Sequence, residues 1–184
     1  HALRKVVVKE QPQIAHNLTT TRMETLKRWF ENRGATSAIA DDLAKEGFRV
    51  FYEERQNVTP YPGTVATLSQ LSNNFKLAAI TNGNADLMAM QIGQYFQFSL
   101  KSQDFLEPKP APVMFEEALK RLKVDPHECM LIGDDIEHDV MGARQVGMKT
   151  VWFNVHKLSQ EGEILADYVI TDLRELLHLL KQHG

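Results

Sequence analysis

The most informative segment of this chain is Ile132-Gly133-Asp134-Asp135-Ile136-Glu137-His138-Asp139. It directly follows the apolar pair Met130-Leu131, so a short buried strand ends where the acidic residues begin. Adjacent carboxylates at the mouth of a buried strand repel one another, and a hard divalent cation with oxygen ligands offsets that cost. We therefore expect Asp134, Asp135 and Asp139 to hold Mg²⁺, with Asp139 either a ligand or a support for the others. The alternative is that the acids only cap the next helix, a role that suits one aspartate better than three.

Short apolar stretches alternate with amphipathic helical patterns throughout the second part of the chain. We expect strands at 77–80, 130–132, 150–153 and 168–170, and helices at 65–75, 88–96, 115–122, 140–146 and 173–180. Unbroken apolar strands separated by amphipathic helices are typical of a parallel sheet covered on both faces. The fold class is therefore α/β, a doubly wound parallel-sheet core, in which ligands bind at the carboxyl ends of the strands.

The first part of the chain is helical in pattern. Apolar residues follow helical spacing from Ile14 to Phe30 and again from Ala40 to Phe51, and Gly34 stands between the two stretches as a helix stop. This pattern predicts a helical hairpin. We therefore divide the chain into a small helical cap at 1–57 and the α/β core at 58–184.

Two further polar clusters lie next to predicted elements. Thr81-Asn82-Gly83-Asn84 comes directly after the strand at 77–80, and a hydroxyl followed by the amides of a tight turn is a natural cradle for a phosphate. Prolines on both sides of Lys109 fix the backbone around one ammonium group, as stabilisation of phosphoryl charge requires. Both clusters also have ordinary interpretations, as a common Asn-Gly turn and as a rigid loop with a solvated lysine. The candidate phosphate-binding residues are Thr81, Asn82, Gly83 and Lys109, and Lys109 is also the candidate catalytic residue.

The composition excludes several other classes of protein. The chain has 184 residues, 43% of them hydrophobic and 24% charged, which is typical of a packed domain and not of a disordered chain. Its formal net charge is −3, so no positive excess is available for a nucleic acid or an anionic membrane. The single cysteine, Cys129, cannot form an internal disulfide, and no apolar run is long enough to span a bilayer. We therefore expect a cytoplasmic protein that acts on a small molecule, with neither nucleic acid nor membrane as a partner.

Taken in this order, the Thr81 cluster, Lys109 between prolines, and the stretch Gly133-Asp134-Asp135 with Asp139 resemble motifs two, three and four of the haloacid dehalogenase superfamily. The resemblance covers residues 58 to 184, and the helical segment before it resembles that family's cap. Within the cap the chain is similar to the riboflavin-pathway phosphatase branch, which acts on flavin mononucleotide and related sugar phosphates, at Pro12, Ile14, His16, Thr19 and Arg22. Of these residues, His16 and Arg22 either face a substrate or are solvated helix residues.

The resemblance implies the hydrolysis of a phosphomonoester through an aspartyl-phosphate. Thr81 and Asn82 would hold the phosphoryl oxygens, Lys109 would neutralise the nucleophile and the phosphate, and Asp134 would ligate Mg²⁺. Asp135 and Asp139 would be further ligands or support for them. The substrate would be a small phosphorylated metabolite, such as a flavin or sugar phosphate. Two alternatives stay open: a haloacid dehalogenase-type hydrolase, whose reaction has no use for a metal, and a non-catalytic phosphate-binding module.

The chain departs from the family at motif one, because residues 1–184 contain no Asp-x-Asp. In the resembling fold this motif ends a strand in mid-sheet, between the strands that end at Thr81 and Gly133. Losing that strand leaves two rows of backbone groups unpaired, each group costing on the order of a few kcal/mol, so an isolated chain of this length should fold poorly. We expect that the sequence, which opens with His1, lacks on the order of 30 to 50 preceding residues. Alternatively, the stretch Arg4 to Lys9, which contains three consecutive valines and is ambiguous between strand and helix, fills the gap.

Overall fold

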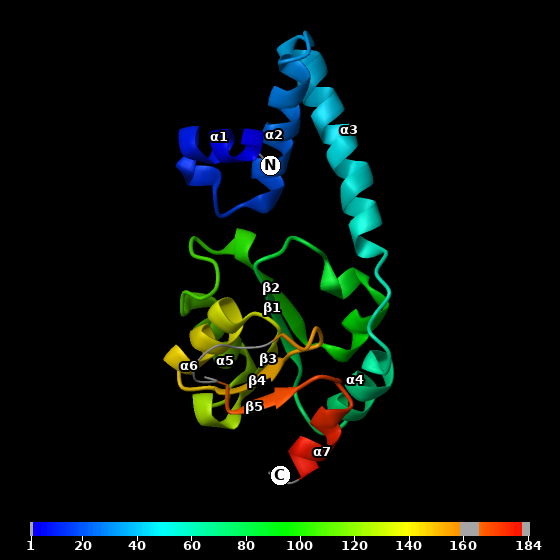
Figure 1. Ribbon diagram of the computed structural model, residues 1–184, viewed down its shortest axis with the longest axis vertical. Helices are drawn as coiled ribbons and strands as arrows, with labels where there is room; N and C mark the ends of the chain where they lie inside the picture. The colour runs from blue at the N-terminus through cyan, green and yellow to red at the C-terminus, as the bar shows by residue number, and fades with distance from the viewer. Residues whose placement is uncertain (1, 159–165, 182–184) are drawn as a thin grey trace.

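The computed structural model describes residues 2–158 and 166–181 (Figure 1). The first three helices form one body at the top of the view, and the strands with their helices form a second body below it. The end of α3 continues into an extended linker that enters the lower body at α4. His1, with which the sequence opens, lies outside the described residues.

The upper body is built on a helical hairpin, which confirms the prediction from the apolar spacing. The Asn17 side chain accepts a hydrogen bond from the amide of Thr20 at 2.9 Å and so begins the first helix of the hairpin. Gly34, at φ +93°, supplies the left-handed turn between the two helices. Ala40 and Ala44 are buried, so the second helix can approach the first closely. The elements of this body are α1 (Ala2–Glu10), the 3₁₀ turn η1 (Pro12–Ile14), α2 (Leu18–Glu31) and α3 (Ser37–Gln56).

The stretch whose conformation the sequence left open lies in α1, so the suggestion that it fills a gap in the sheet is wrong. Val7 is fully buried in the upper body, and Glu10 forms an ion pair with Arg28 of α2. Intrinsic helix propensities differ by only a few tenths of a kcal/mol between valine and its neighbours. Burial of Val7 against the hairpin therefore outweighs the strand preference of the three valines.

The lower body contains two parallel sheets. One sheet pairs β1 (Ala78–Thr81) with β2 (Phe98–Lys101), and the other has the order β3 (Met130–Gly133), β4 (Lys149–Phe153) and β5 (Tyr168–Ile170). Every pairing is parallel, with Ala78 opposite Phe98 and Met130 opposite Lys149. The α/β fold class is confirmed. The sequence analysis did not predict β2. Its four residues directly follow a helix-like apolar pattern, and four residues are too few for their alternation to be recognised as a separate strand.

Helices cover the strands through two apolar clusters. Leu71, Val151, Ile170 and Leu176 join α4 and α7 to β4 and β5, whereas α5 and α6 pack around Phe115 in the other cluster. Among the described residues, no helix combines the length and the apolar character that crossing a membrane requires. The helices of this body are α4 (Thr64–Ser72), α5 (Val113–Leu122), the π-helix η6 (Ile136–Met141), α6 (Gly142–Gln145) and α7 (Glu175–Lys181).

The α-helix predicted at 88–96 is wrong. The segment forms two 3₁₀ turns, η2 (Leu87–Ala89) and η3 (Gln91–Tyr95), separated by Met90 in an extended conformation. A Cβ at Gly93 would lie 2.5 Å from the Leu87 carbonyl oxygen, so the two turns fold tightly on each other. The chain must reach β2 within a few residues, and tight turns achieve this where a continuous helix would carry it past the strand. Two more 3₁₀ turns, η4 (Ser102–Asp104) and η5 (Pro126–Glu128), complete the lower body.

The packing of Gly142 gives a test of the lower core. A Cβ at Gly142 would lie 2.7 Å from the fully buried Phe115 ring, whereas a Cβ at the exposed Gly47 of α3 meets only the Leu26 side chain, at 4.0 Å. We expect Gly142→Ala to destabilise the protein by about 1–3 kcal/mol. Gly47→Ala, the same change in a helix with room for a methyl group, should stabilise it by about 0.5–1 kcal/mol. Urea unfolding of both variants measures the two free energies, and the same sign for both would contradict this packing.

Candidate functional site

The carboxyl ends of β1 and β3 meet at the mouth of one cavity. Among the described residues, β1 pairs with β2 alone and β3 with β4 alone, so the remaining edge of each strand has no strand beside it. Both strands line a cavity of about 670 Å³ together with Lys109, Asp134 and Asp139. The structure thus brings together the ends of the three clusters that the sequence singled out. The cavity separates the same two strands between which the family resemblance placed a further strand.

The central contact of this site is a buried ion pair between Lys109 and Asp139. Lys109 Nζ lies 2.5 Å from Asp139 Oδ1, and it also donates a hydrogen bond to the Ile80 carbonyl oxygen at 3.1 Å. Only 9% of Lys109 and 6% of Asp139 is exposed. A cation held in this way at the end of β1 carries its charge at a fixed position, in surroundings where water screens it little.

Asn82 positions the backbone of Lys109. Its side-chain Oδ1 accepts a hydrogen bond from the Lys109 amide, and its Nδ2 donates one to the Lys109 carbonyl oxygen, both at 2.8 Å. The Ser102 hydroxyl in turn donates to the Asn82 carbonyl oxygen at 3.0 Å. The Asn82 side chain is therefore engaged with the lysine loop, and its predicted contact with a phosphoryl group stays a prediction.

Thr81 and Gly83 form a small turn at the end of β1. The Gly83 amide donates a hydrogen bond to Thr81 Oγ1 at 2.9 Å. A Cβ at Gly83 would lie 3.1 Å from Thr81 Oγ1 and 3.1 Å from Arg55 Nη2, so glycine leaves room for a cap side chain to approach the turn. Their predicted role in phosphate binding is compatible with this position at the cavity mouth.

The three aspartates after β3 differ in their surroundings. Asp135 begins η6, where its Oδ1 accepts a hydrogen bond from the His138 amide at 2.8 Å and its Oδ2 lies 3.0 Å from His138 Nδ1. Burial alone would raise the pKa of Asp135, but these hydrogen bonds outweigh it and lower the pKa. Asp139 is committed to Lys109 and accepts a hydrogen bond from the Asp135 amide at 3.2 Å. Asp134 is exposed at the cavity mouth, where its carbonyl oxygen accepts a hydrogen bond from Trp152 Nε1 at 3.1 Å.

These aspartates allow a direct assessment of the expected metal site. In the part of the chain that the structure describes, no three His, Cys, Asp or Glu side chains converge as a metal-binding group. Mg²⁺, however, keeps several waters and commonly takes only one or two protein carboxylates together with phosphate oxygens. Asp134, a hard oxygen donor that lines the same cavity as Thr81, fits that arrangement. Asp135 and Asp139 are held in place by other partners, so their predicted role as ligands stays a prediction.

Gly133 explains how Asp139 reaches across the end of β3. A Cβ at Gly133 would lie 2.4 Å from the Asp139 side chain, closer than any real contact allows. Only glycine therefore lets the Asp139 carboxylate pass over the strand end and meet Lys109. No sequence pattern predicts this ion pair, because its partners lie 30 residues apart on different elements.

Contacts between the cap and the loop after β1 include Gln56 and Asp86, which sequence reasoning missed. Asn84, only 1% exposed, donates a hydrogen bond from Nδ2 to Thr19 Oγ1 of α2 at 3.1 Å. The Asp86 amide donates to Gln56 Oε1, at the end of α3, at 2.8 Å. The loop that follows β1 is thus bonded to both helices of the cap hairpin. The predicted orientation of His16 toward a substrate stays a prediction.

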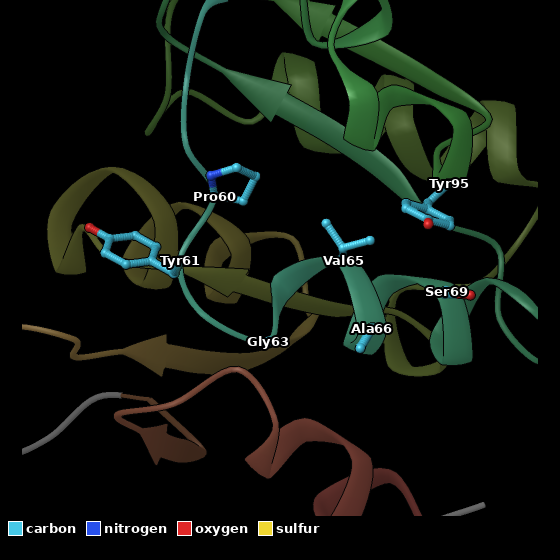
Figure 2. Close-up of a pocket in the computed structure, with 7 residues that line it drawn as sticks. All are labelled: Pro60, Tyr61, Gly63, Val65, Ala66, Ser69 and Tyr95. Atoms are coloured by element: carbon cyan, nitrogen blue, oxygen red, sulfur yellow. The ribbon is translucent and has the colours of Figure 1, made fainter.

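A second hollow lies at the junction between the linker and α4 and encloses about 500 Å³ (Figure 2). Tyr61 of the linker packs edge-on against Phe153, with ring centroids 5.7 Å apart. Its lining residues include no carboxylate, amine or imidazole, and their polar side-chain groups are the hydroxyls of Tyr61, Ser69 and Tyr95. The lining residues are Pro60, Tyr61, Gly63, Val65, Ala66, Ser69 and Tyr95.

Comparison with known proteins agrees with this architecture. Residues 1–147 match the family model of haloacid dehalogenase-like hydrolases. The 5-amino-6-(5-phospho-D-ribitylamino)uracil phosphatase YigB of Escherichia coli is 30% identical over 177 residues, which cover 96% of this chain and 71% of that protein. A glyceraldehyde 3-phosphate phosphatase of Pyrococcus furiosus is 35% identical over 132 residues, which cover 67% of this chain.

The structural comparison points the same way. The crystal structure of a 2-haloacid dehalogenase from Pseudomonas syringae superposes with a TM-score of 0.93 at 34% identity, covering 100% of this chain and 80% of that one. The chain spans only 55% of the length of the Pyrococcus phosphatase. The family match, the curated relatives and the fold agree, and the chain belongs to the haloacid dehalogenase-like hydrolases.

Proposed function

We propose that this protein hydrolyses phosphate monoesters of small metabolites with the help of Mg²⁺. The observation that carries the proposal is the buried Lys109 ammonium, fixed at the end of β1 in a cavity that Thr81 and the exposed Asp134 also line. A fixed cation and an open carboxylate at one strand edge suit a bound phosphoryl group with its metal. The curated relatives named above are phosphatases of small phosphorylated molecules by name, which supports the same class of substrate.

In this proposal Lys109 neutralises charge on the phosphoryl group. Its position costs no reorganisation during the reaction, because the Ile80 carbonyl, Asp139 and the Asn82 side chain already hold it. Preorganised charge of this kind stabilises a transition state more than a mobile surface lysine does. Thr81 and the amides of its turn would bind the phosphoryl oxygens.

Asp134 would hold Mg²⁺, and Asp135 and Asp139 would support it. When bound, Mg²⁺ would neutralise phosphate charge and polarise the ester. Asp135 keeps η6 in register through His138, and Asp139 fixes the lysine, so both carboxylates shape the site. We assign no nucleophile among residues 1–184.

Two narrower points belong to this proposal. The similarity to the E. coli phosphatase supports a flavin or sugar phosphate as the substrate. A cytoplasmic location agrees with the free thiol of Cys129, whose burial raises its pKa and makes it less reactive.

The similarity to the Pseudomonas structure favours a second candidate function, the dehalogenation of a 2-haloacid. Displacement of a halide from carbon makes no use of a divalent metal. The two reactions therefore separate by product and by metal requirement. A phosphate-binding module without turnover is the third outcome that the following experiment distinguishes.

The phosphatase proposal predicts Mg²⁺-dependent phosphate release from p-nitrophenyl phosphate by the gene product that contains these 184 residues. Asp134→Asn should lower this rate by about 100-fold or more, because the metal loses its protein carboxylate. Asp41→Asn, at an aspartate on α3 that pairs with Lys45, is the matched control and should leave the rate unchanged. Chloride release from 2-chloropropionate without Mg²⁺ would establish the dehalogenase instead. Phosphate binding with no release of either product would leave only the binding module.

The ion pair predicts a large loss of stability when one partner is removed. Asp139→Asn leaves the Lys109 ammonium buried without its counter-charge, so we expect unfolding to become easier by about 3–5 kcal/mol in urea titrations. The double variant Lys109→Met with Asp139→Leu should recover most of that loss, since no buried charge remains. Asp41→Asn breaks a pair of the same chemistry and the same 2.5 Å separation in exposed surroundings, and its unfolding midpoint should barely move. Equal losses for the buried and the exposed pair would contradict the role given to burial.

A further inference from the structure

Two arginines of the cap meet above the turn that follows β1. Arg22 belongs to α2 and Arg55 to the last turn of α3, and the charge of Arg55 contributes to lowering the pKa of Arg22. Arg22 stacks on the Phe51 ring, with its Cζ 4.3 Å from the ring centroid. Phe51 lies one helical turn before Arg55 on α3, so a single face of that helix places both groups.

The two guanidinium groups have covered nitrogen atoms that lack hydrogen-bond partners. Arg22 Nη1 and Arg55 Nε are both covered from solvent, and neither has a hydrogen-bond partner within the described chain. Burial, the neighbouring charge of Arg55 and that of Arg4 all lower the pKa of Arg22. Buried polar groups are rarely left unsatisfied, and a buried charge without a partner is costly. Here two helices each place a guanidinium with an unsatisfied nitrogen near the same turn, which lowers the stability of the fold. Such a cost is characteristic of a binding site.

The position of the pair relates it to the candidate phosphate site. Arg55 Nη2 and Thr81 Oγ1 lie at equal distances of 3.1 Å from the point that a Gly83 Cβ would occupy, so the guanidinium borders the turn directly. The Asn84 side chain beside it also has a buried oxygen, Oδ1, without a partner. A phosphoryl group bound at the turn would therefore have the arginine pair on its cap side.

We propose that Arg22 and Arg55 form a second anion site, which binds a carboxylate on the substrate while the Thr81 turn holds the phosphoryl group. The planar guanidinium is suited to carboxylates, because two parallel hydrogen bonds match the spacing of the carboxylate oxygens. This inference rests on the proposed phosphatase function. It favours phosphate esters of small hydroxy acids over the flavin or sugar phosphate that the similarity to the E. coli phosphatase supports. Flavin mononucleotide, which carries no carboxylate, would be a weaker substrate.

The experiment uses two ligands that differ in one group. Phosphoglycolate has a carboxylate where 2-hydroxyethyl phosphate has an uncharged alcohol. Calorimetric titration without Mg²⁺ measures the Kd of both ligands, and steady-state kinetics with Mg²⁺ measures KM and kcat. The variants are Arg22→Gln and Arg55→Gln, and Arg33→Gln is the matched control, because Arg33 stacks on the half-exposed Trp29 with its Cζ 3.6 Å from the ring centroid.

We expect each of the two variants to weaken phosphoglycolate binding by about 10- to 100-fold, the range for loss of a charge-assisted hydrogen bond. Binding of 2-hydroxyethyl phosphate should stay unchanged, and Arg33→Gln should change neither Kd. KM should rise for phosphoglycolate alone, with kcat retained. The ligand-free Arg22→Gln protein should unfold at an equal or higher urea concentration, since a charged group with a covered, unsatisfied nitrogen is gone.

Four results would overturn the inference. An equal loss for both ligands would place the arginines on the phosphoryl group, and no loss for either would remove them from the site. A fall in stability of ligand-free Arg22→Gln would assign the pair to the fold. The arginine site and the phosphatase function can fail separately. Turnover of phosphate esters with no preference for a carboxylate would support the phosphatase function and contradict the arginine site. Arginine-dependent binding of phosphoglycolate without turnover would support the arginine site and contradict the phosphatase function.

Discussion

The buried contact between Lys109 and Asp139 is the constraint on which the site depends. It joins the proline-bound loop before α5 to the π-helix after β3, and through the Ile80 carbonyl it ties both to the end of β1. A buried ion pair contributes little net stability, since desolvation offsets most of the attraction, but the loss of either partner is costly. Its value in this protein is therefore positional. It fixes the Lys109 ammonium group at the end of β1, and this position constrains the residues around it.

Two neighbouring residues show how far this requirement extends. Gly133 has no side chain, because the Asp139 carboxylate occupies the space where a Cβ would lie. Asn82 uses both ends of its amide on the Lys109 backbone, so a residue of the β1 turn holds the lysine loop. The cavity between β1 and β3 adds an apolar floor below this polar rim. The polar groups thus act where water is partly excluded, and their electrostatic interactions are correspondingly stronger.

The sequence was sufficient for the class of fold and for the meeting of the polar clusters. Buried strands and amphipathic helices have different periods, and the carboxyl ends of parallel strands lie on one edge, so Thr81 and Asp134 were expected at a common site. Lys109 was added to that site by the family resemblance. The sequence could not show that Asp139 faces Lys109, because no local pattern relates a helix residue to a loop 30 positions away. It also missed β2 and turned η2 and η3 into one helix. The conformation of such short elements depends on the path that the chain takes between larger ones. That path leaves no hydrophobic periodicity in the sequence.

The cap, too, was only partly predictable from the sequence. Periodicity identified the hairpin of α2 and α3, but it says nothing about which face of the hairpin meets the turn after β1. That orientation decides which charges are compensated. Lys109 is neutralised within the chain by Asp139, whereas covered nitrogen atoms of Arg22 and Arg55 are not. A cation that already has an anionic partner within the chain must divide its interaction between that partner and a ligand. Its main role is therefore to fix geometry and charge. A covered cation without a partner gains the full strength of a new hydrogen bond when an anion arrives, and it therefore serves best to discriminate between ligands.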